Sequence, residues 1–270
     1  MKPKFSSTEM FCLLACAAGL WLALLLPEVQ QSATHHHFAD QRMYGGLPCT
    51  LDVLSNLPFA VLGVLGLLNL APAHRVHRAQ WGSAVLFFAG LVATAVGSAV
   101  YHLQPDDAGL VLDRLGMVLA FAGLLGLAAS DRVSDRAGWA LGGAVLLLGP
   151  ISVLVWRNSG NVLPWAVLQF GGMALVLGLA LLRPAPGALG LRLGVVMLVY
   201  GSAKLFELAD HAIFELTQHL VSGHSLKHVV ASLAALPVIG AMRLRTAHSG
   251  QNPAHVPQTR SGAPSPWRNA

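Results

Sequence analysis

Charged residues are scarce in this chain of 270 residues, where Asp, Glu, Lys and Arg together make up 11% of the sequence. Hydrophobic residues make up 54%, and the mean hydropathy is +0.60. This composition excludes a soluble protein of this length, which needs a larger polar surface. Long unbroken apolar runs favour membrane-spanning helices over a barrel.

Cysteine is nearly absent, with Cys12, Cys16 and Cys49 as its only occurrences. Three cysteines at these spacings provide neither a disulfide framework nor a thiolate metal site. Cys12 and Cys16 lie within an apolar run, where we expect them to be small packed residues.

Eight apolar runs predict an all-α polytopic membrane protein, a seven-helix bundle plus an N-terminal hydrophobic helix or signal segment. Each core run, of about 18 to 22 residues, can cross ~30 Å of hydrocarbon. The N-terminal run covers about 10–26, and either a cleaved signal peptide or an uncleaved anchor explains it. The core runs cover about 51–70, 81–102, 109–130, 137–156, 162–182, 191–208 and 221–242.

These runs divide the chain into three parts. Residues 1–50 form the N-terminal segment and an extracytoplasmic linker, 51–242 the membrane domain, and 243–270 a basic cytoplasmic tail. The tail is rich in Gly, Pro, Ser and Arg, which predicts disorder. The linker contains His35, His36 and His37, a run that is typical of a solvated loop.

Basic residues are distributed unevenly between the two sides of the predicted bundle. With a cytoplasmic N-terminus, twelve lie in cytoplasmic segments and two, Arg42 and Arg157, in opposite loops. By the positive-inside rule both termini are cytoplasmic, or the N-terminus is extracytoplasmic if a signal is cleaved. Helix orientation explains the pI near 9.5, and we expect no nucleic-acid partner. The twelve are Lys2, Lys4, Arg75, Arg78, Arg132, Arg136, Arg183, Arg192, Arg243, Arg245, Arg260 and Arg268.

Polar residues gather where the runs 81–102 and 109–130 meet. Ser98 and His102 are four residues apart, so they share one helix face, and Asp113 is predicted in the first turn of the next helix. His224 and His228 repeat this spacing at the start of the last run. The predicted topology brings all five to one depth on the extracytoplasmic side. Three histidines are sufficient to hold a zinc ion and leave its fourth position open, as a catalytic site requires.

These residues carry a resemblance to a known family. The segment Gly97-Ser98-Ala99-Val100-Tyr101-His102, the aspartate eleven residues later and the final-run His-x-x-x-His resemble the alkaline ceramidases. Ser55-Asn56 at the start of the first core run also resembles that family. The ceramidases belong to a superfamily of seven-span hydrolases that includes the adiponectin-type receptors. The acidic calcium-binding segment of the eukaryotic ceramidases is not matched here, and the extra N-terminal run lies outside the family's seven-span pattern. The chain is therefore more similar to a bacterial relative, in an inner membrane.

The resemblance implies a function for each of these residues. His102, His224 and His228 would bind Zn²⁺, Asp113 would act on the water that the metal holds, and Ser98 would assist at the reacting carbonyl. The expected activity is hydrolysis of the amide bond of a ceramide-like membrane lipid, which enters sideways from the outer leaflet. The alternative is a receptor-like binding module with structural zinc; a transporter is not favoured, because paired broken helices are not apparent.

Other ionisable residues lie near the outer helix ends. Lys204 and Glu207 are three residues apart and are expected to pair. Asp210 and His211 are interpreted as a solvated helix end. Arg114 and Lys227 each adjoin a site residue, and binding of a lipid headgroup phosphate is one interpretation of them.

Overall fold

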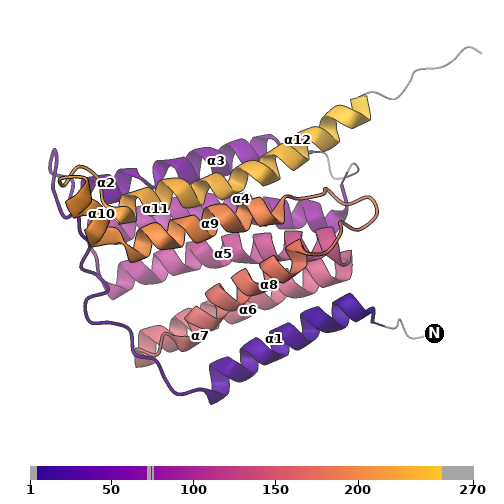
Figure 1. The fold of residues 1–270 in the computed structure, drawn as a ribbon, viewed down its shortest axis with the longest axis horizontal. Helices are drawn as coiled ribbons and strands as arrows, with labels where there is room; N and C mark the ends of the chain where they lie inside the picture. The colour runs from indigo at the N-terminus through magenta and orange to yellow at the C-terminus, as the bar shows by residue number, and fades with distance from the viewer. Residues whose placement is uncertain (1–4, 72–73, 75, 251–270) are drawn as a thin grey trace, which may run out of the picture.

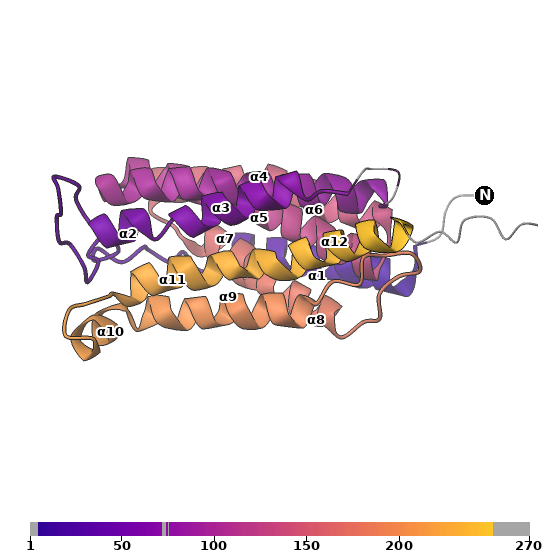
Figure 2. The ribbon, with the colours of Figure 1, turned by 90° about the horizontal axis from the view of Figure 1, so that it is seen from above.

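The computed structural model describes residues 5–71, 74 and 76–250 (Figure 1). This part of the chain forms helices, two isolated bridges and no strand, and the long helices run alongside one another (Figures 1 and 2). The helices are α1 (Ser7–Leu25), α2 (Thr50–Leu54), α3 (Leu57–Leu68), α4 (Arg78–Leu103), α5 (Asp107–Arg132), α6 (Asp135–Ser159), α7 (Leu163–Ala166), η2 (Val167–Gly171), α8 (Gly172–Ala180), α9 (Leu193–Leu208), α10 (Asp210–Leu216), α11 (Gly223–Ser232), η3 (Leu233–Ala235) and α12 (Leu236–Gly250).

Seven helical segments are long and apolar enough to cross a membrane, which indicates an integral membrane protein. The predicted run 191–208 is not one of them, because α9 has only 16 residues and gives way to the short α10. The seven are Ser7–Leu25, Thr50–Leu68, Arg78–Leu103, Asp107–Arg132, Asp135–Ser159, Leu163–Ala180 and Gly223–Arg245.

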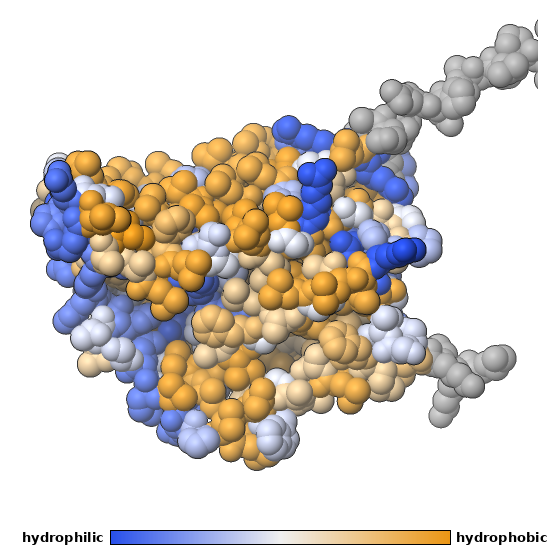
Figure 3. Space-filling model, in the orientation of Figure 1, coloured by the Kyte–Doolittle hydropathy of each residue, from blue (hydrophilic) through white to orange (hydrophobic). Residues whose placement is uncertain are grey.

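The surface of the bundle has the polarity of a membrane protein. Leu14, Leu147 and Leu198 are among many large apolar side chains that point outward and are exposed. Figure 3 shows hydrophobic surface across the middle of one face and hydrophilic groups toward its ends. The centrally placed α4 and α5 are the most buried spans, and α1 is the least buried. The bundle therefore exposes apolar side chains along the length of its helices, as a membrane-embedded surface requires.

Side-chain caps fix where several helices begin. Asp106 accepts a hydrogen bond from the Gly109 N–H at 2.8 Å, and Ser222 accepts one from the Ser225 N–H at 2.9 Å. Such caps satisfy N–H groups that have no partner within the helix. Because α5 begins at Asp107, Asp113 lies in its second turn rather than in the predicted first turn.

Two glycines allow the site-bearing helices to approach closely. A Cβ atom on Gly97 would lie 2.5 Å from the Leu112 carbonyl oxygen, so α4 and α5 contact each other backbone to backbone. A Cβ atom on Gly223 would lie 2.3 Å from the Phe206 carbonyl oxygen, which brings the start of α11 against α9. Small residues at helix contacts serve this purpose in membrane bundles.

The N-terminal helix is attached to the bundle by a polar contact. Glu9 in α1 is buried and accepts hydrogen bonds from Arg136 at 2.5 and 3.0 Å and from Ser134 at 2.7 Å. The contact joins α1 to the start of α6 at the bundle end opposite the linker (Figure 1).

At the other terminus, the predicted tail began at Arg243, whereas α12 continues to Gly250. Lys2, Lys4, Arg75, Arg260, Arg268 and the rest of the tail, 251–270, lie outside the described residues.

Candidate metal centre

Three histidines from two helices meet inside one end of the bundle. His102 lies in the last turn of α4, and His224 and His228 lie one turn apart in α11. Their side chains are buried, and one ring nitrogen from each lies within 4.8 Å of the others. The prediction that the topology joins these three residues is confirmed.

The cluster fits a divalent metal ion. Neither ring nitrogen of His102 has a hydrogen-bond partner among the described residues, although the residue is 0% exposed. A buried nitrogen without a partner is unfavourable, and a metal ion is the partner that three converging imidazoles can share. Among the described residues, no carboxylate belongs to the group of ligand atoms that lie within 4.8 Å of one another.

Hydrogen bonds fix the tautomer of His228. The Ser55 hydroxyl donates to the Asp52 carbonyl oxygen at 2.9 Å and lies 2.8 Å from His228 Nδ1. Because that hydroxyl proton is already used, Ser55 accepts the Nδ1–H, and Nε2 keeps its lone pair for a metal. Such outer hydrogen bonds orient histidine ligands. Ser98 Oγ lies 3.4 Å from the same Nε2.

Asp210 positions His224, contrary to its interpretation as a solvated helix end. Its side chain is 14% exposed, accepts the His224 N–H at 2.8 Å and accepts the Ala39 N–H of the linker at 3.0 Å. Its neighbour His211 is 65% exposed, as expected. The difference arises because the linker folds back onto this helix end, a contact that the local sequence does not indicate.

The start of α11 is held by Asp52, which sequence reasoning did not place in the site. Its Oδ1 accepts hydrogen bonds from Ser225 at 2.6 Å and Ser222 at 3.2 Å, and the residue is 0% exposed. A carboxylate at the start of an apolar run was the available signal, but its partners lie about 170 residues away.

Phe38 in the linker covers the histidines and was also missed. Its ring centroid lies 4.6 Å from that of His102 and 4.4 Å from that of His224. Nearby in the linker, Asp40 and Arg42 form an ion pair at 2.7 Å, and Arg42 also donates to the Leu220 carbonyl oxygen at 3.1 Å. Burial opposes the charge of Asp40, but hydrogen bonds from Arg42 lower its pKa overall. His36, predicted to be solvated, contacts the Tyr101 hydroxyl at 2.8 Å.

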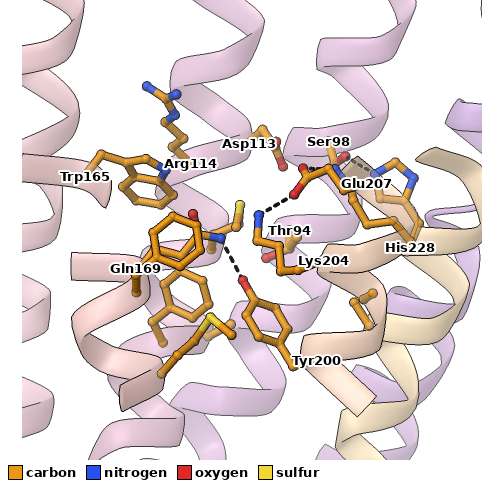
Figure 4. Close-up of a pocket in the computed structure, with 18 of the residues that line it drawn as sticks. Thr94, Ser98, Asp113, Arg114, Trp165, Gln169, Tyr200, Lys204, Glu207 and His228 are labelled. Atoms are coloured by element: carbon orange, nitrogen blue, oxygen red, sulfur yellow. Dashed lines mark hydrogen bonds and ion pairs between the residues drawn. The ribbon is translucent and has the colours of Figure 1, made fainter. Parts of the chain in front are cut away.

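A cavity of about 790 Å³ adjoins the histidines. Ser98, Asp113, His224 and His228 line it together with apolar residues of α5, α8 and α9 (Figure 4). The Asp113 carboxylate makes no hydrogen bond or ion pair to any described residue, so it is available to a ligand. All the predicted site residues therefore lie in or beside one chamber.

The predicted ion pair between Lys204 and Glu207 is present, and a second lysine joins it. Glu207 also accepts from Lys227 at 2.9 Å, and Lys227 Nζ lies 3.0 Å from His224 Nε2. Both lysines that line the cavity thus share one carboxylate partner.

Three searches, against protein-family models, curated proteins and solved structures, found no match to this chain. The geometry of this site and the residue pattern therefore carry the functional argument.

Proposed function

We propose that this protein is a zinc-dependent membrane amidohydrolase that cleaves the N-acyl amide bond of ceramide-like lipids. The observation that carries the proposal is the placement of three buried histidines beside a cavity of about 790 Å³ that Ser98 and Asp113 also line. A large, mostly apolar chamber with a few polar groups at one end suits a lipid with a single reacting bond.

His102, His224 and His228 would hold the zinc ion, with Ser55 fixing His228 in the required tautomer. When bound, zinc supplies Lewis acidity and lowers the pKa of water to about 7. The free carboxylate of Asp113 would take a proton from the attacking water and pass it to the leaving amine. Ser98 would turn its hydroxyl from His228 to the substrate carbonyl and donate a hydrogen bond to the developing oxyanion.

The lipid would enter from the side of the bundle. The cavity is lined by Trp165 and Gln169 from one side and by Tyr200 and Lys204 of α9 from the other. In the view of Figure 3, a recess with hydrophilic groups lies between the apolar surfaces of these two segments. We infer that the site faces the extracytoplasmic side, because it lies opposite the basic loops. The resemblance to bacterial relatives implies that the membrane is a bacterial inner membrane.

The test is to incubate purified protein with a panel of lipid amides and to detect released fatty acid by mass spectrometry. Asp113→Asn should retain the metal and lose turnover by about 10²- to 10⁴-fold. Asp135→Asn is the matched control and should leave turnover unchanged, because Asp135 is an exposed carboxylate at the opposite end of the bundle.

A receptor-like binding protein with structural zinc is the second candidate, favoured by the packing of Phe38 over two of the histidines. In that case the purified parent protein should hold zinc that is needed for its stability, and it should cleave nothing on the panel. This pair of results would exclude the hydrolase.

A further inference from the structure

Arg114 is a buried cation in the wall of the cavity. It follows Asp113 in α5, is 3% exposed and lines the same chamber as the histidines. In Figure 4, Arg114 and Trp165 lie on one side of the pocket, Ser98 and His228 lie on the other, and Asp113 lies between them.

The surroundings of Arg114 hold its guanidinium without neutralising it. The group lies 4.0 Å from the ring centroid of Trp156 and 5.4 Å from that of Trp165, and it donates to Gln31 Oε1 at 2.6 Å. Its Nη1 is buried and has no hydrogen-bond partner among the described residues, and no described carboxylate oxygen lies within 4.0 Å of the guanidinium.

The other cations of the cavity differ in this respect. Lys204 and Lys227 both pair with Glu207, whereas the partners of Arg114 among the described residues are a neutral amide and two aromatic faces. A buried charge without a counter-charge is strongly unfavourable. Stacking on two indoles keeps the planar guanidinium in place, and its free N–H groups match the oxygens of a carboxylate or phosphate.

We propose that Arg114, supported by Gln31, Trp156 and Trp165, binds the anionic headgroup of the lipid that occupies the cavity. The proposal deepens the proposed function and rests on it for the identity of the cavity as the lipid site. The preferred lipid would then have a carboxylate or phosphate headgroup. Arg114 would hold this headgroup on the side of Asp113 that faces away from the histidines.

The test compares two amphiphiles that contain no amide bond, hexadecyl phosphate and hexadecanol. Their binding to the full chain in a neutral detergent is followed by calorimetry and by tryptophan fluorescence. We expect hexadecyl phosphate to bind about 10- to 100-fold more tightly, the effect of charge-assisted hydrogen bonds. Arg114→Gln should abolish this preference, and Arg114→Lys should keep a reduced one because the charge stays while the paired donors are lost.

Arg157→Gln is the matched control, since Arg157 is half-exposed at the same end of the bundle, and it should keep the full preference. If Arg114→Gln does not fold, the reduced preference of Arg114→Lys decides the question. Equal binding of both amphiphiles by the parent protein, or an unchanged preference in both Arg114 variants, would overturn the proposal. Inorganic phosphate that competes as well as hexadecyl phosphate would also overturn it, by identifying a free-anion site.

Hydrolysis assays keep the two proposals separate. Arg114-dependent binding of hexadecyl phosphate in a protein that cleaves no lipid amide would support the subsite and remove the hydrolase. Equal cleavage of neutral and anionic lipid amides, with no effect of Arg114→Gln, would support the hydrolase and remove the subsite.

Discussion

Single hydrogen bonds decide whether the histidine cluster can act as a ligand set. His228 offers Nε2 to a metal only because Ser55 accepts the proton on Nδ1. Asp210 fixes the backbone at His224 in a comparable way. His102 has no such partner among the described residues, so its orientation depends on packing against Phe38 and Tyr101.

The role of Ser55 gives the first prediction. Ser55→Ala removes the acceptor that fixes the His228 tautomer, and the zinc affinity should fall by about 10- to 100-fold. Competition with a chelator measures this affinity. Ser202→Ala is the control and should leave the affinity unchanged, because among the described residues the Ser202 hydroxyl bonds only to the backbone of its own helix. An equal effect of both substitutions would show that Ser55 does not tune the metal.

The Asp40–Arg42 ion pair gives a pH-dependent prediction. The pKa of Asp40 is lowered below its ordinary value of 3.8, so the pair stabilises the fold above that pH and loses its effect as the pH falls through the folded-state value. Asp40→Asn should lower stability by about 1 to 3 kcal/mol at pH 7. Thermal unfolding should show this difference unchanged at pH 5 and reduced below pH 3.8. A difference that persists in acid would contradict the role of the charge.

At the scale of helices, the sequence predicts which helix ends carry the site residues, but it does not predict which other segments pack against them. Apolar runs and four-residue spacings bring Ser98, His102 and His228 to one end of the bundle without knowledge of any contact. The roles of Phe38 and Asp52 could not be predicted, whereas α9 ends at Leu208, where the run 191–208 was predicted to end. The role of Phe38 depends on the linker folding back over the helices, and the role of Asp52 depends on contacts with Ser222 and Ser225, about 170 residues away. Periodicity carries no information about such contacts.

The close approach of α4 and α5 gives a prediction at this scale. Gly97→Ala places a methyl group 2.5 Å from the Leu112 carbonyl oxygen, and neither backbone can move without displacing Ser98 or Asp113. Overpacking of this kind costs about 1 to 3 kcal/mol. We expect lower thermal stability and weaker zinc binding. Gly143→Ala on α6 is the control, because nothing lies within 4 Å of the added atom.

Over the whole molecule, charge and chemistry are separated between the two ends of the bundle. The basic residues of one end include Arg132, Arg136, Arg183, Arg192, Arg243 and Arg245, whereas the histidines lie at the opposite end, beneath the linker (Figure 1). The two basic residues in the loops of that opposite end, Arg42 and Arg157, lie near carboxylates, Arg42 at 2.7 Å from Asp40 and Arg157 at 3.9 Å from Asp107. Arg114, Lys204 and Lys227 lie in helices at the same end and line the cavity.

This separation predicts the orientation of the protein in the membrane, because basic loops are retained in the cytoplasm. In a background with all three cysteines replaced by alanine, Gln104→Cys at the histidine end should react with an impermeant thiol reagent added outside intact cells. Pro186→Cys, exposed at the basic end, should react only after the membrane is broken. The opposite labelling pattern would place the histidines and the adjoining cavity on the cytoplasmic side, where the proposed lipid substrate would have to come from the inner leaflet.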